Sequence, residues 1–136
     1  MKNTPEKKEI IELSMPINAA YVSAVRLTSS SIANRLGFDV DEIEDIKAAV
    51  SEACAFIIKK SDAAKSKLFK VTFTMDASFI EIKMDSCFRL AETTDDDDMS
   101  LLMVKALMDD LEVFSKTDSD VEIIMLKKHK ENSLGI

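Results

Sequence analysis

Glycine and cysteine are scarce in this sequence. Only Gly37 and Gly135 occur among its 136 residues. Phosphate-binding loops use several glycines, because residues without a Cβ let the backbone turn sharply and approach the phosphates closely. The sequence therefore contains no conventional glycine-rich phosphate cradle. The two cysteines, Cys54 and Cys87, are expected to stay unpaired, as is usual in an intracellular protein.

Long apolar runs and positive charge are also lacking. No run approaches the roughly 20 apolar residues that a membrane-spanning helix needs, and the first ten residues, MKNTPEKKEI, contain no apolar signal segment. The 18 Lys and Arg residues are outnumbered by 25 Asp and Glu residues, which gives a net charge of −7. Nucleic-acid binding requires clustered positive charge. We expect a cytoplasmic protein that contacts neither membrane nor nucleic acid and instead binds a protein or a small ligand.

The balance of residue types predicts one folded domain. Hydrophobic residues make up 46% of the chain and charged residues 32%, which is typical of a packed globular protein. The length suits a single domain over residues 1–136, with a core at about 9–128 and a flexible tail at 129–136. His129, which has no ligand residue near it in the sequence, is predicted to be exposed to solvent.

Local patterns in the first half predict a strand followed by two helices. The stretch EIIELSMPI alternates between apolar and polar residues, as a strand does. A helix follows from Asn18, and Gly37 ends it. A second helix begins at Asp39, which forms a capping-box pattern with Glu42 ahead of an apolar stripe at helical spacing.

The second half predicts a hairpin, a helix and another hairpin. Alternating residues at 67–88 form two strands around a short turn at 76–78. A short helix is predicted at 99–110, and two final strands at 110–115 and 121–128. This order of elements predicts an α+β two-layer sandwich, in which about three helices cover one face of a mainly antiparallel sheet.

Three segments resemble a known protein family. They are residues 15–54, 101–116 and 121–128, and the similarity extends over about 9–128. They are similar to the anti-sigma factor serine-protein kinases of the RsbW type, members of the GHKL superfamily of histidine-kinase-like ATPases with a Bergerat-type fold. The resemblance implies a homodimer that binds ATP and magnesium, captures a sigma factor, and phosphorylates a serine of a STAS-type anti-anti-sigma partner.

The first active-site motif of that family is matched only in part. The family motif reads Glu, Ala, Cys, Thr, Asn, Ala, Val, and this sequence has EACAFII at residues 52–58. The resemblance gives Glu52 the position of the catalytic base. Phe56 stands where the family has a magnesium-binding asparagine, and a phenyl ring supplies no oxygen to a cation that requires oxygen ligands.

The nucleotide-binding motifs depart further from the family. In MDSCFRL, Asp85 takes the position of the adenine-contacting aspartate, while Cys87 replaces the first glycine of the motif. The Gly-Leu-Gly step that cradles the phosphates in the family is matched by Asp98, Met99 and Ser100. Both motifs have therefore lost the glycines that allow close backbone approach.

An acidic run, Asp95 to Asp98, occupies the expected phosphate site. Each like charge at a few Å costs about 1 kcal/mol even at the dielectric constant of water, whereas a helix N-terminus offers about half a positive charge. We therefore expect no bound ATP unless metal ions bridge the carboxylates to the phosphates. Three alternatives for the run stay open: a solvated acidic turn that stabilises the helix, a divalent-cation site, or a partner contact.

Three functional hypotheses follow. We expect an anti-sigma-factor-like regulator that acts by protein–protein binding, needs no cofactor or metal, and has lost ATP binding and kinase activity, so that Glu52 is a remnant. The alternative is an active serine/threonine-protein kinase that uses Mg-ATP, with Glu52 as base and Asp85 holding adenine. The third option is a remodelled pocket, lined by Cys54, Phe56, Asp85 and Cys87, that binds another small molecule.

Overall fold

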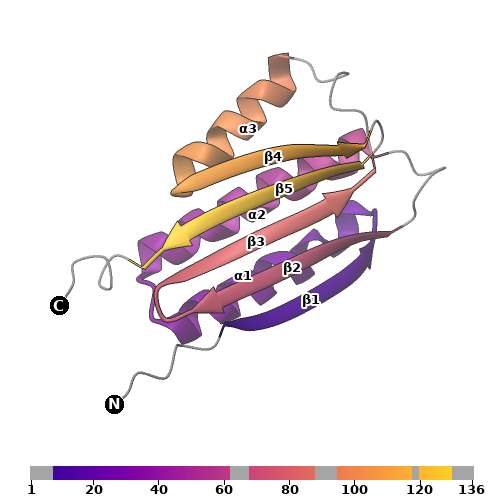
Figure 1. Ribbon diagram of the computed structural model, residues 1–136. Coiled ribbons are helices and arrows are strands. Elements are labelled where there is room, and N and C mark those ends of the chain that lie inside the picture. The colour runs from indigo at the N-terminus through magenta and orange to yellow at the C-terminus, as the bar shows by residue number, and fades with distance from the viewer. Residues whose placement is uncertain (1–7, 62–67, 88–94, 118–119, 130–136) are drawn as a thin grey trace.

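The computed structural model describes residues 8–61, 68–87, 95–117 and 120–129. Within these residues the chain forms five strands, three α-helices and one short 3₁₀-helix (Figure 1). In chain order they are β1 (Glu9–Pro16), η1 (Ala19–Tyr21), α1 (Val22–Leu36), α2 (Val40–Lys60), β2 (Leu68–Asp76), β3 (Phe79–Ser86), α3 (Asp95–Leu107), β4 (Asp110–Thr117) and β5 (Asp120–Lys128). The order is the one that the sequence patterns predict.

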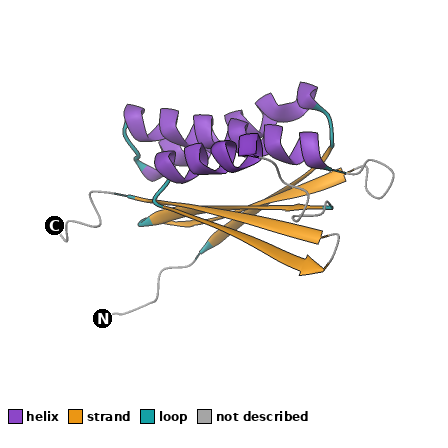
Figure 2. Cartoon of the chain, turned by 90° about the horizontal axis from the view of Figure 1, so that it is seen from above, coloured by secondary structure: helices purple, strands orange, loops and turns teal. Residues whose placement is uncertain are grey.

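The strands form one antiparallel sheet in the order β1-β2-β3-β5-β4. The three helices lie together on one face of this sheet (Figure 2). The predicted two-layer α+β sandwich is therefore confirmed. β1 and β4 are the two edge strands.

The ends of the first two helices are fixed by their own residues. Oδ1 of Asn18 accepts a hydrogen bond from the Ala20 amide at 2.9 Å, where the first helical segment begins. Gly37 follows α1 with a φ of 87°, a left-handed conformation that strains residues with a Cβ. Asp39 and Glu42 form the predicted capping box, with hydrogen bonds of 2.8 and 2.9 Å. These local interactions position α2, which carries the predicted catalytic base, Glu52.

α3 begins earlier than the sequence patterns predict. The helix covers Asp95–Leu107 rather than 99–110, so its first turn includes the acidic run. Carboxylates are favourable at this end because the first backbone amides and the helix dipole present positive charge there. The link at 88–94, which precedes the helix, lies outside the described residues.

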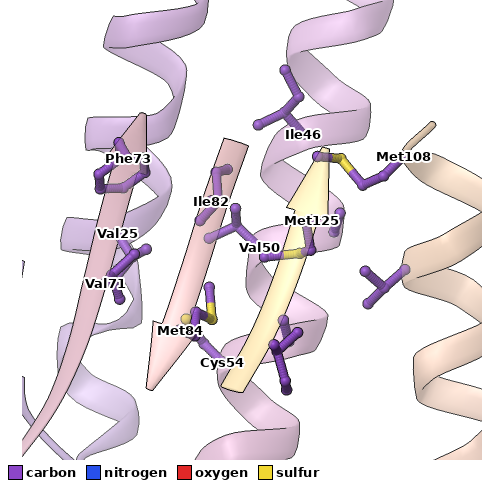
Figure 3. Close-up of a cluster of buried hydrophobic side chains, with 14 of the residues drawn as sticks. Val25, Ile46, Val50, Cys54, Val71, Phe73, Ile82, Met84, Met108 and Met125 are labelled. Atoms are coloured by element: carbon purple, nitrogen blue, oxygen red, sulfur yellow. The ribbon is translucent and has the colours of Figure 1, made fainter. Parts of the chain in front are cut away.

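The core lies between the sheet and the helices. β3 alternates strictly, with buried residues toward the helices and half-buried residues on the other face. Figure 3 shows Val50 and Cys54 of α2 beside Ile82 and Met84 of β3 and Met125 of β5. Full burial of such side chains stabilises the fold by about 1.5–3 kcal/mol each. Because the side chains of β3 alternate between the two faces, only those on the inner face can contact α2.

The prediction that His129 is exposed is wrong. Its side chain is only 6% exposed, its ring centroid lies 4.9 Å from that of Phe38, and its amide donates to the Ser78 carbonyl at 2.8 Å. β5 runs antiparallel to β3, so its last residues reach the β2–β3 turn. This sheet pairing brings His129 to the α1–α2 junction, which no neighbouring residue in the sequence indicates. The remainder of the predicted tail, residues 130–136, lies outside the described residues.

Both cysteines are free thiols, as predicted. Cys54 is fully buried in the core, and burial raises the pKa of its thiol to about 12, because an apolar environment disfavours the thiolate. Its role is therefore packing. None of the described helices is both long enough and apolar enough to cross a membrane.

Candidate functional site

Glu52 and Phe56 lie one turn apart on α2, so their side chains leave the same side of the helix. Glu52 is half-buried, whereas Phe56 is only 3% exposed and belongs to the hydrophobic core. A phenyl ring in this position contributes apolar packing and offers no oxygen to a cation. The helical turn after Glu52 therefore contributes its side chain at position 56 to the hydrophobic core.

Asp85 lies on the face of the sheet that points away from the helices. Its neighbours across the sheet are Lys70 of β2 and Glu122 of β5. Lys116 of β4 makes ion pairs with Asp85 at 3.1 Å and with Glu122 at 2.9 Å. Hydrogen bonds from the ammonium to Glu122, and then to Asp85, raise the pKa of Lys116 above its usual range. The carboxylate predicted to contact adenine is engaged in this surface network.

Ser86 takes the helix-facing position at the end of β3. Successive residues of a strand point to opposite faces, so Ser86 points inward like Met84, and Asp85 points outward. Ser86 is 7% exposed, and its Oγ lies 2.6 Å from the Oγ of Ser61, which caps the end of α2. Asp85 and Glu52 are thus on opposite sides of the sheet. The alternation in the sequence already contains this signal, because Asp85 is one residue out of phase with the inward positions.

A hollow of about 380 Å³ opens where β2 begins and β3 ends. Among the residues that line the hollow, those with a charged group or a thiol are Lys70, Asp85, Cys87, Lys116 and Asp120. Within it, Sγ of Cys87 donates to Oδ1 of Asp120 at 3.3 Å. Cys54 and Phe56 are not among the described residues that line this hollow. Of the four residues of the predicted small-molecule pocket, Asp85 and Cys87 line this hollow, and Cys54 and Phe56 belong to the core.

The start of α3 is open to solvent where its side chains are described. Asp95 and Asp98 are exposed and Ser100 is half-buried, while the side chains of Asp96 and Asp97 lie outside the described part. No group of three or more His, Cys, Asp or Glu side chains among the described residues is arranged to hold a metal ion. This arrangement fits a solvated acidic turn that stabilises the helix.

The residues at the matched positions do not fit a magnesium nucleotide. Phe56 offers no ligand oxygen to the cation, and Asp85 is paired with Lys116 on the far face of the sheet. Asp98 takes the position that matches the first glycine of the phosphate motif, and its exposed carboxylate would repel a phosphate there. Of the catalytic groups inferred from the resemblance, Glu52 alone lies on the helix side with its chemistry unchanged.

The sequence matches known proteins over most of its length. Residues 15–127 match the family described as histidine kinase-like ATPase domain. The chain is 30% identical over 142 residues to the serine-protein kinase RsbW of Bacillus cereus strain G9842. It is 28% identical over 140 residues to the RsbW of Bacillus thuringiensis strain Al Hakam. Each similarity covers 90% of this chain and 86% of the relative.

The fold is also found in a solved structure. The crystal structure of the RsbU and RsbW domains of a Mycobacterium tuberculosis protein covers 88% of this chain with a TM-score of 0.70 and 13% sequence identity. This chain spans 32% of that longer chain, and at such low identity the likeness concerns the fold alone. The extent of the family match and the identity to the Bacillus relatives place the protein: it belongs to the histidine kinase-like ATPase domain family and, within it, to the RsbW type.

Proposed function

We propose that this protein is a regulatory relative of the RsbW kinases that acts by binding other proteins and has lost ATP binding and kinase activity. The observation that supports this most directly is the buried Phe56, one helical turn after Glu52. Phosphoryl transfer depends on metal and phosphate contacts that are held in position. Without a ligand oxygen at Phe56, Glu52 has no positioned phosphoryl group to act on.

The partners that we propose are a sigma factor, a STAS-type anti-anti-sigma protein, or both. This choice of partners rests on membership of the RsbW type.

We also propose that two copies of the chain form a homodimer. β1 is an edge strand, and its Ile10 and Ile11 are 63% and 41% exposed. Unpaired strand edges with exposed apolar residues are templates for association, which supports a homodimer.

Titration with Mg-ATP tests the loss of nucleotide binding. We expect millimolar Mg-ATP to give no saturable heat in calorimetry and no shift of the unfolding temperature. The RsbW of Bacillus cereus serves as the comparison protein under the same conditions. A saturable signal with this protein would overturn the proposal.

The retained Glu52 favours the second candidate, an active serine/threonine-protein kinase with an altered ATP site. Such an enzyme would transfer labelled phosphate from ATP to an anti-anti-sigma protein, and the Glu52→Gln variant would not. We expect no transfer by either form. Transfer that depends on Glu52 would establish the kinase.

Binding to purified partners tests the regulatory part separately. The sigma factors and anti-anti-sigma proteins of the source organism, each tagged and purified, are tested for co-elution with this protein on size exclusion. We expect at least one stable complex. If none forms, the anti-sigma role is excluded, whereas the loss of ATP binding is judged by the nucleotide titration alone.

A further inference from the structure

α3 presents a stripe of apolar side chains to solvent. Met99, Leu102 and Met103 are 63%, 62% and 50% exposed, and Ala106 continues the line one turn later. Residues three and four apart lie on one side of a helix. Val104, on the other side of α3, is 1% exposed and packs in the core. α3 thus has two apolar sides, of which the described part of the fold buries one.

Carboxylates flank this stripe at both ends. Asp95 and Asp98 lie in the first turn of α3, and Asp109 and Asp110 follow its last turn; all four are exposed. At 1.5 Å per residue, the distance along the helix between the two acidic ends is roughly 20 Å. The two acidic ends are therefore about as far apart as the ends of a partner helix of four turns, and the stripe lies between them.

α3 lies at the margin of the helix layer, where another molecule can approach. Figure 1 shows it beyond α2, next to the edge strand β4. α2 packs against its inner flank. The outer flank, which carries the stripe, faces away from α2.

We propose that the stripe of Met99, Leu102 and Met103 is a docking surface for a basic amphipathic helix of a partner protein. The partner helix lays an apolar face on the stripe and places Lys or Arg side chains beside the aspartates at the two ends. Methionine suits such a surface, because its flexible side chain adapts to the shape of the partner. The charges at the ends align the partner helix along the stripe and speed its association.

The flanking charges disfavour the other occupants of an apolar helix face. If two copies packed through α3 in antiparallel orientation, Asp95 and Asp98 of one copy would lie beside Asp109 and Asp110 of the other. Parallel packing would bring identical acidic ends together. An anionic lipid surface attracts helices rich in Lys and Arg, whereas α3 carries a single lysine, Lys105, and has aspartates at both ends. The inference concerns this surface alone and holds whichever protein is the partner.

Two synthetic 18-residue helical peptides test the proposal. One carries Leu residues along one side and Lys residues at both ends, and the other has Glu in place of each Lys. In fluorescence anisotropy with the full chain, we expect the Lys peptide to bind at least tenfold more tightly than the Glu peptide. The difference should shrink at high salt, because exposed charges are screened.

Variants of the protein locate the binding surface. Leu102→Ser combined with Met103→Ser should weaken Lys-peptide binding at least tenfold and lower the unfolding temperature by only a few degrees. Both side chains are exposed, and Ser is a somewhat weaker helix former than Leu or Met. The matched control is Leu27→Ser, which removes a leucine that is 68% exposed on α1 and should leave peptide binding unchanged. Asp95→Asn should weaken binding of the Lys peptide only.

Three results would overturn the proposal. The first is equal binding of the Lys and Glu peptides by the unmodified protein. The second is an equal loss of peptide binding in the Leu27→Ser control. The third is a dimer in analytical ultracentrifugation that Leu102→Ser dissociates, because that result assigns the stripe to a second copy of this chain.

Discussion

At position 56, the hydrophobic core favours an apolar side chain, whereas the catalytic motif of the family requires a polar one. Its ring is buried with the core residues of α2, while the same position in the RsbW motif inferred from the sequence holds a polar metal ligand. A polar side chain at such a site must be solvated or hydrogen-bonded, whereas the apolar ring needs neither. We therefore expect the phenyl ring to favour the stability of the fold and to disfavour metal binding at this position.

We predict that Phe56→Asn destabilises the protein without creating an ATP site. Loss of a buried phenyl ring lowers the free energy of unfolding by about 3–5 kcal/mol. We expect no Mg-ATP binding, because the carboxylate of Asp98 would still repel the phosphates and Asp85 would still lie on the far face of the sheet. Urea unfolding and calorimetry measure the two effects. Ala55→Asn, at an exposed position of the same helix, should cost no more than about 0.7 kcal/mol, because it changes helix propensity alone. Mg-ATP binding by Phe56→Asn would show that the missing ligand was the sole barrier.

The elements that the sequence predicted well are those with local signals. The capping box at Asp39, the left-handed Gly37 and the two-residue alternation of the strands each depend on neighbouring residues, and each is present in the structure. The start of α3 was missed because an acidic run resembles a link as much as a first helical turn. The side of the sheet on which Asp85 lies does not follow from the family motif, because a motif gives a residue's place along the chain and not the phase of the strand.

We predict that Asp39→Ala lowers the free energy of unfolding by about 1 kcal/mol. The substitution removes the acceptor for the Glu42 amide and breaks the capping box at the start of α2. Asp41→Ala is the matched control, because it removes an exposed carboxylate from the same turn without removing the cap. Its cost should stay near a few tenths of a kcal/mol. Chemical unfolding measures the free energy of unfolding of both variants. Equal losses in the two would show that charge rather than capping stabilises the N-terminus of α2.

At the scale of the whole molecule, the strand order and the position of His129 were beyond local patterns. β5 lies between β3 and β4, and this pairing brings the end of β5 to the β2–β3 turn and the α1–α2 junction. A Cβ added to Gly37 would lie 3.4 Å from Nε2 of His129, which shows how closely the two layers approach. His129 thus connects the last strand to the helix layer.

This connection makes His129 a structural residue, and we predict that His129→Ala lowers the free energy of unfolding by about 2 kcal/mol. The substitution removes a buried ring that packs against Phe38, and both the lost apolar burial and the ring contact contribute. His129→Phe retains an aromatic ring and should preserve most of that stability. Lys128→Ala, at the exposed neighbouring position, should change it by less than about 0.5 kcal/mol. Equal losses of unfolding free energy in His129→Ala and Lys128→Ala, measured by urea unfolding, would contradict the prediction. The His129 ring would then make no contribution to packing the end of β5 against the α1–α2 junction.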